Sequence, residues 1–346
     1  MNKSTIIAIA VCIIGIGLII IGLVGIKGKW NTISKASADM IQLTYECRSS
    51  VDSIVVSEKS DDVTITVGNV SAPVITYYVQ KGYENKVEVG EYGGKLKFER
   101  KDHDLHINFV FFNFGTDFDQ KTVVTVPKNF RGNVELETTS GRIKAEDLEG
   151  CTFSAKSTSG GITAKKISSP EGFIASATSG EVDITDCECR DKMTLGSTSG
   201  RVSANNIDCS ELEAANNSGG IKLEDVNADS MNLKVTSGSI RIEDIKSGTM
   251  SLKSTSGTIN MENVVVDEIT CNSTSGGVHF SKLDAGRSIV IGCNSGSVRG
   301  SIKGKESDFS IITSTNSGSS NLKDSRSGSK TLDISTTSGG IKVDFD

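Results

Sequence analysis

Apolar residues in the second part of the chain recur with a period of 19 to 22 residues. Each period contains a Ser-Gly dipeptide that follows Thr or Asn. Six residues before each of these serines the chain carries an apolar residue, and three residues after it carries Ile or Val, with Ser320 as the exception. The serines are Ser140, Ser159, Ser179, Ser199, Ser218, Ser237, Ser256, Ser275, Ser295, Ser317 and Ser338.

Two short strands are predicted in each repeat, one on either side of the Ser-Gly. Polar residues separate the apolar positions, and this period of two is typical of half-buried strands. Apolar residues five and eight positions after the serine break the alternation, so a second corner is expected between them. Because one repeat cannot bury its own apolar face, the repeats must stack. The sequence predicts an all-β fold in which 134–346 form a parallel β-solenoid, a right-handed β-helix with about 19–20 residues per coil.

The tripeptide Thr-Ser-Gly has a structural explanation. Glycine allows a positive φ or a close approach between backbones at a corner. The Thr or Asn before the serine can hydrogen-bond to nearby backbone, or to its equivalent one coil away, about 4.8 Å along the axis. We interpret the tripeptide as a folding device, and a ladder that also contacts a ligand is the alternative.

Residues 40–133 are predicted to form an irregular β-strand region that opens or caps the solenoid. Within it, 54–67 and 87–98 resemble degraded coils, with Ser60-Asp61 and Gly93-Gly94 in place of the Ser-Gly corner.

Phenylalanine is concentrated just before the regular repeats. Seven of the twelve phenylalanines lie between Phe98 and Phe130, four of them in FVFFNF at 109–114. A solenoid end needs a cover because it exposes unpaired backbone and core side chains. We expect 109–114 to be an aromatic cap, and an apolar patch for a partner or the membrane is the alternative.

The N-terminal residues are typical of a membrane anchor. Residues 6–26 carry no charge, and a helix of this length, at about 1.5 Å per residue, crosses a hydrocarbon core of about 30 Å. We expect 1–5 to be a short head, 6–26 a single-pass transmembrane helix and 27–39 a linker. A short head favours a cytoplasmic N-terminus, which places the bulk of the chain outside the cell membrane. Positive charges on the two sides are nearly balanced, so the inverted orientation is the alternative.

Composition and motifs argue against several functional classes. The net charge is −6 without a basic block, which argues against a nucleic-acid partner. No motif of a serine hydrolase, zinc protease, phosphate-binding loop or dinucleotide-binding fold occurs. Residues 134–346 contain no Trp or Tyr, the side chains on which sugars stack in glycan-cleaving enzymes. We therefore predict no catalytic residue, no cofactor and no enzymatic activity.

Two groups of potential metal ligands have simpler explanations. DHDLH at 102–106 does not have the spacing of a known metal site. Acidic residues recur six and seven positions after the repeat serine, as in Glu224-Asp225. A solvated corner explains these acidic residues better than a calcium stripe does, and no metal site is predicted.

The cysteines are predicted to be structural. Cys187, Cys271 and Cys293 fall in inward columns, where a thiol packs as a small apolar group. Cys189 and Cys209 occupy the same position in adjacent repeats, so a disulfide between them is left open.

The chain also resembles a known family. The resemblance is carried by the short opening strands, by KTVVTVPKNF at 121–130, and by VELETTSGRI from Val134 with the T-S-G-x-I copies that follow. In these segments the chain resembles the bacterial putative adhesin family, cell-envelope domains of unknown function. The resemblance implies a surface or regulatory role, in adhesion or envelope-stress signalling, and brings no catalytic residues.

We therefore predict a membrane-anchored extracytoplasmic β-solenoid that presents a repeat surface to a cell-envelope protein or a cell-wall polymer. A carbohydrate-active or glycan-binding β-helix protein is the first alternative. A cytoplasmic scaffold tethered to the membrane is the second.

Overall fold

The computed structural model describes residues 40–101 and 121–346, which divide between two compact units. Of the described residues, the smaller unit holds 40–43 and Tyr78–Asn85. Within it the Tyr78 hydroxyl donates a hydrogen bond to the Gln42 side chain (3.2 Å). The larger unit, Thr44–Tyr77 with Lys86–Asp346, contains the repeats.

Most of the described secondary structure is β-strand. Two short 3-10 helices, η1 (Glu84–Lys86) and η2 (Glu306–Asp308), lie between strands. The strands are β1 (Met40–Glu46), β2 (Ser53–Glu58), β3 (Asp62–Gly68), β4 (Val74–Gln80), β5 (Val87–Tyr92), β6 (Lys95–Arg100), β7 (Lys121–Pro127), β8 (Asn133–Thr138), β9 (Ile143–Glu146), β10 (Thr152–Ser157), β11 (Ile162–Lys165), β12 (Ser168–Ser169), β13 (Phe173–Ala177), β14 (Val182–Ser197), β15 (Val202–Asn216), β16 (Ile221–Val235), β17 (Ile240–Ser254), β18 (Ile259–Ser273), β19 (Val278–Cys293), β20 (Val298–Ile302), β21 (Phe309–Thr315), β22 (Lys330–Thr336) and β23 (Ile341–Phe345).

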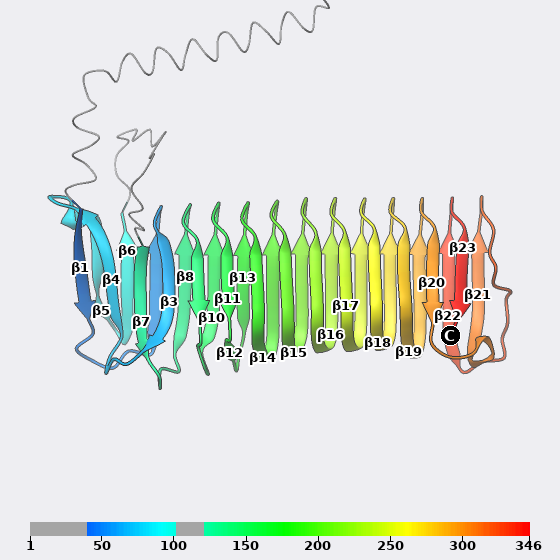
Figure 1. The fold of residues 1–346 in the computed structure, drawn as a ribbon, viewed down its shortest axis with the longest axis horizontal. Coiled ribbons are helices and arrows are strands. Elements are labelled where there is room, and N and C mark those ends of the chain that lie inside the picture. The colour runs from blue at the N-terminus through cyan, green and yellow to red at the C-terminus, as the bar shows by residue number, and fades with distance from the viewer. Residues whose placement is uncertain (1–39, 102–120) are drawn as a thin grey trace, which may run out of the picture. The chain divides into compact units, whose positions relative to one another are not determined.

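Successive repeats stack in parallel, so that each strand lies beside its equivalent in the next repeat (Figure 1). Met231 pairs with Met250, and Ile240 pairs with Ile259. The apolar column six residues before the repeat serines is buried throughout, with no member more than 3% exposed. The predicted parallel β-solenoid is therefore confirmed.

The second corner lies seven residues after the repeat serine. In eight successive repeats this residue has a positive φ, between 51° and 61°, which turns the chain between the inward columns at positions five and eight. Asp and Asn tolerate this conformation better than other side chains, which explains the recurring acidic residues at this corner. The eight residues are Asp147, Lys166, Asp186, Asn206, Asp225, Asp244, Asn263 and Lys282.

The tripeptide glycine is required by close backbone approach. A Cβ on Gly160 would lie 1.8 Å from the carbonyl oxygen of Gly141, and a Cβ on Gly180 would lie 1.9 Å from that of Gly160. This contact repeats along the corner, while the Ser159 N–H donates to the Thr139 carbonyl of the preceding coil (2.8 Å). The prediction that the tripeptide is a folding device is confirmed, by close approach and not by a positive φ.

The coils at the N-terminal end do not stack in chain order. β2 and β3 form a coil across Ser60-Asp61, as the sequence of 54–67 predicts. β2 pairs with both β6 and β8, and β3 pairs with both β7 and β9. The first coil in the chain is therefore enclosed between the second, which contains β6 and β7, and the third, which contains β8 and β9.

The prediction that 87–98 form a degraded coil with its corner at Gly93-Gly94 is wrong. β5 and β6 form an antiparallel hairpin, and Gly93 and Gly94 have φ values of 57° and 79°, as two-residue hairpin turns require. β6 alone joins the parallel stack. Antiparallel strands, β5 beside β6 and β4 beside β7, therefore flank this end of it.

The C-terminal end shows the same departure from chain order. On one side β19 pairs with β22, which pairs with β21, and on the other β19 pairs with β20, which pairs with β23. Figure 1 shows β22 and β23 between β20 and β21. The glycine corner follows this order, since Gly339 approaches the Gly296 carbonyl and Gly318 approaches that of Gly339. The last repeat of the chain is therefore not the last coil of the solenoid.

Three predicted features lie outside the described residues: the anchor at 6–26, the DHDLH cluster at 102–106 and the FVFFNF segment at 109–114. Across 40–101 and 121–346, no helix has the length and apolarity needed to cross a membrane.

Candidate binding furrow

The residue two positions before each repeat serine supports the corner from inside. Ser197 Oγ accepts a hydrogen bond from the Gly200 N–H (2.9 Å) and donates one to the Gly180 carbonyl of the preceding coil (3.0 Å). Asn216 makes the equivalent pair of bonds to Gly219 and Gly200. The sequence predicts this role for the Thr or Asn directly before the serine. That prediction is wrong by one residue, because the side chains directly before the serine are exposed.

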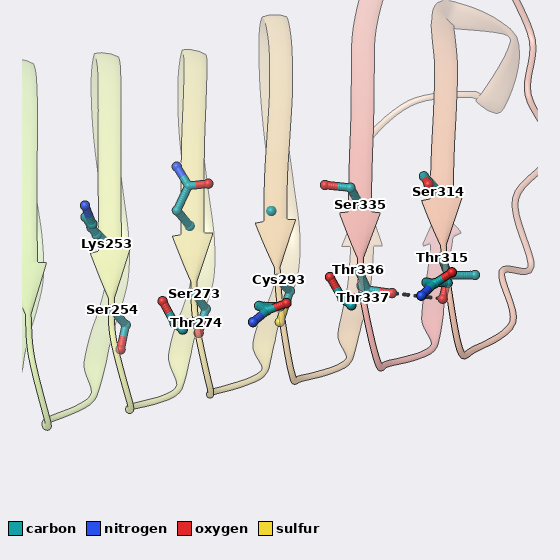
Figure 2. A pocket seen from close by; sticks show the side chains of 14 residues that line it. Lys253, Ser254, Ser273, Thr274, Cys293, Ser314, Thr315, Ser335, Thr336 and Thr337 are labelled. Carbon is teal, nitrogen blue, oxygen red and sulfur yellow. Dashed lines mark hydrogen bonds between the residues drawn. The ribbon is translucent and has the colours of Figure 1, made fainter.

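A furrow follows these corners across the C-terminal coils. It has a volume of about 610 Å³ and crosses β17, β18, β19, β22 and β21. Figure 2 shows its side chains in a row across these neighbouring strands. Positions three, two and one before the repeat serine supply the lining: Lys253, Ser254, Asn272, Ser273, Thr274, Gly292, Cys293, Asn294, Ser314, Thr315, Asn316, Ser335, Thr336 and Thr337.

The furrow offers hydrogen-bonding groups and little charge. Asn272, Asn294 and Asn316 carry amides that both donate and accept, and the serine and threonine hydroxyls do the same. Of the residues that line the furrow, Lys253 alone is charged. Gly292 lies against the Asn272 amide, since a Cβ there would be only 2.8 Å from Asn272 Oδ1 and would force that amide to move. This lining suits a polar, uncharged partner.

A second furrow, of about 410 Å³, uses the same three positions in β2, β8, β10 and β13. Its lining includes Glu58, Lys59, Glu137 and Lys156. Lys156 Nζ lies 3.4 Å from Glu137 Oε1, and both side chains are about half exposed. The two furrows therefore share their place in the repeat and differ in charge.

The first coil replaces the neutral corner with a buried ionic network. Glu58 stands where Ser197 stands in a middle coil, and its carboxylate accepts hydrogen bonds from Arg100 Nε and the Thr122 hydroxyl (2.9 Å). Arg100 also donates to Asp61 Oδ2 (2.9 Å). Burial raises the pKa of Asp61 to about 6, although Arg100 acts in the opposite direction. The carboxyl of Asp61 is therefore more easily protonated than an exposed aspartate.

The cysteines have packing roles in the structure. Cys189 and Cys209 are in-register partners in adjacent coils, and both are buried free thiols. Burial raises the pKa of Cys209 to about 12 and that of Cys187 to about 11. These two thiols stay protonated at neutral pH, and a protonated thiol is a poor nucleophile.

The repeat pattern alone did not locate the furrow. The tripeptide was the candidate ligand ladder, but the lining begins two residues before it. One feature of the sequence does mark the furrow. The position three residues before the repeat serine holds only small or amide residues in the last repeats: Asn272, Gly292, Ser314 and Ser335.

The repeats match a family model over two overlapping stretches, 51–224 and 188–344. The chain belongs to the Toastrack family, DUF4097. Together these stretches cover the early coils and every Ser-Gly repeat, so the resemblance stated from the sequence is confirmed.

Several solved structures are similar to this Toastrack chain at low identity. A putative adhesin from Bacteroides fragilis NCTC 9343 is 13% identical, with 89% of this chain and 99% of that chain covered and a TM-score of 0.29. A putative adhesin from Parabacteroides merdae ATCC 43184 is 13% identical (89% and 98% covered, TM-score 0.39). A putative lipid binding protein from Parabacteroides distasonis ATCC 8503 is 17% identical (88% and 96% covered, TM-score 0.33). Among curated proteins, none matches the chain.

Proposed function

We propose that this Toastrack chain is a binding protein that holds an extended, polar polymer along its solenoid. The observation that carries the proposal is the C-terminal furrow, to which five coils contribute equivalent positions, most of them with neutral hydrogen-bonding side chains. A linear partner along the axis would meet a similar set of donors and acceptors about every 4.8 Å. Contacts that are weak one by one add up when many are made together.

The proposed setting is the outer side of the cell membrane, with 6–26 as a single-pass anchor. The uncharged sequence of 6–26 supports the anchor. In this setting a cell-wall polymer is the partner that best suits the furrow, and the biological role is adhesion or envelope-stress signalling. Protease added to intact protoplasts is expected to remove the repeats. Full protection that ends only on lysis would place them in the cytoplasm.

Binding without catalysis is part of the same proposal. The buried serines beside the corner, such as Ser197 and Ser254, are engaged with backbone glycines, and the pKa of Cys209 is raised well above neutrality. Labelled cell-wall glycans incubated with the purified full chain are expected to remain intact on chromatography. Cleavage that one carboxylate substitution abolishes would identify an enzyme.

Gly292→Val tests the furrow directly. The new side chain would displace the Asn272 amide and obstruct the furrow, and we expect binding to insoluble cell-wall polymers to fall about tenfold or more. Gly196→Val is the matched control, because Gly196 holds the same repeat position outside this furrow. A Cβ there would lie 3.7 Å from the Ala215 carbonyl oxygen, an ordinary van der Waals contact. Co-sedimentation of the detergent-solubilised full chain measures both. Equal binding by the two variants would contradict the furrow as the site.

A further inference from the structure

The outer edge of β21 ends one side of the parallel stack. Among the described strands, β21 forms a ladder with β22 alone, so its other edge directs N–H and C=O groups away from the solenoid. Its sequence, FSIITST, carries no charge and is rich in β-branched residues, and Ile312 is 47% exposed. An uncharged edge strand of this kind is prone to pair with another chain.

Residues 323–328, here called the strap, close this edge. The Ile311 N–H donates to the Ser325 carbonyl oxygen (2.7 Å), and the Ser325 N–H donates to the Ile311 carbonyl oxygen (3.0 Å). The Thr313 N–H donates to Asp324 Oδ1 (2.9 Å), and the Thr313 hydroxyl donates to the same oxygen (3.2 Å). A carboxylate therefore stands where a neighbouring strand would place a carbonyl.

The strap can lie this close because of one glycine. A Cβ on Gly328 would lie 2.2 Å from the Phe309 backbone nitrogen, so a side chain there would push the strap away from β21. Lys323, Asp324 and Arg326 are exposed and add charge to an edge that β21 leaves uncharged. Charged covers are one of the means by which natural β-proteins prevent their edges from pairing.

We propose that the strap guards a self-association edge, and that without it β21 pairs with β21 of a second copy of this chain. Ile311 and Thr313 both direct their N–H groups outward. Two antiparallel copies related by a two-fold axis would place Ile311 of each opposite Thr313 of the other, and such a contact closes at a dimer. The second copy is the partner because this edge is uncharged and complementary to itself.

The test opens the strap with Gly328→Ala combined with Asp324→Ala. The full chain in detergent is analysed by light scattering that separates protein mass from detergent mass, and circular dichroism checks its fold. We expect the protein mass to rise about twofold, as pairing around a two-fold axis requires. Gly172→Ala, at a site where a Cβ meets nothing within 4 Å, is expected to keep the wild-type mass. Thr313→Pro added to the open-strap variant removes an outward N–H and is expected to restore it.

Amide exchange at Ile311 and Thr313 makes a negative result decisive. Wild-type mass with fast exchange would show an open edge that does not pair. Wild-type mass with slow exchange would show a strap that depends on neither Asp324 nor Gly328. Either result overturns the proposal, and so does a dimer that persists with Thr313→Pro. Asp324→Ala alone, which leaves every backbone contact in place, is the second variant in case the double variant unfolds, and it is expected to dimerise partially.

Discussion

The coils in the middle of the solenoid and those at its two ends share the same apolar columns but follow different stacking rules. From β14 to β18, each long strand lies between its neighbours in the chain. At the ends, the first coil (β2, β3) lies between the second and the third, and the last coil (β22, β23) lies between two earlier ones. Both ends of the repeat array are therefore enclosed by other coils.

This difference shows that the repeat sequence determines the conformation of one coil. It does not determine which other coils lie beside that coil. Burial of apolar surface is non-directional, so a column of Ile or Val packs on the same column of any coil. In a stacked array, stability is close to a sum of nearest-neighbour interfaces. A chain-terminal coil usually has one such interface, whereas the first and last coils here have two each.

The largest loss of stability is expected from a substitution in the core of a middle coil. Met231→Asp would place a carboxylate in a buried column and lower the free energy of unfolding by about 4 kcal/mol or more. Lys234 is exposed on the same strand. Lys234→Asp is expected to change the free energy of unfolding by about 0.5 kcal/mol or less. Urea unfolding compares the two. Equal stability would show that the column at Met231 is not core.

A smaller effect tests whether the enclosed end behaves like the middle. Ile341, in the last strand of the chain, is 2% exposed, and Ile240, its counterpart in a middle coil, is 0% exposed. Each substitution by Ala is expected to cost about 2–4 kcal/mol, because both strands have a coil on either side. Ile341→Ala could instead prove nearly neutral while Ile240→Ala is destabilising. That result would show that the last strand frays and that its enclosure between two coils adds nothing to its stability.

The smallest effect is a pH dependence confined to the N-terminal end. The pKa of Asp61 is raised from 3.8 to about 6 by burial, so the folded state holds this proton more tightly than the unfolded state. The stabilising contribution of this proton is complete below pH 3.8 and is lost as the pH rises through 6. Asp61→Asn removes this pH-dependent contribution to the free energy of unfolding.

The difference in stability between wild type and Asp61→Asn should therefore vary between about pH 4 and about pH 7 and stay constant at higher pH. Asp183→Asn, at an exposed aspartate of a middle coil, is the control for the loss of one carboxylate. A flat difference for Asp61→Asn would show that the carboxyl titrates as an exposed one.

Much of the fold could be predicted from the sequence because each coil is encoded by local spacing. The alternation around Ser199 predicted two strands, and the step from Ala204 to Ile207 predicted the corner at which Asn206 takes its positive φ. The hairpin at Gly93-Gly94 was misjudged because the same small residues serve a solenoid corner and a two-residue turn. The furrow was missed because its lining combines positions from five coils, and no single repeat contains it.

The sequence by itself determined the columns, the corners and the glycine at each corner, because these depend on which residues lie a few positions apart. Tertiary structure decided the order of the coils at both ends, the ionic network of Glu58, Arg100 and Asp61, and the strap along β21. The physical reason is that equivalent apolar columns are interchangeable. Only long-range contacts, such as Phe309 against Phe345 with ring centroids 5.7 Å apart, distinguish one neighbour from another.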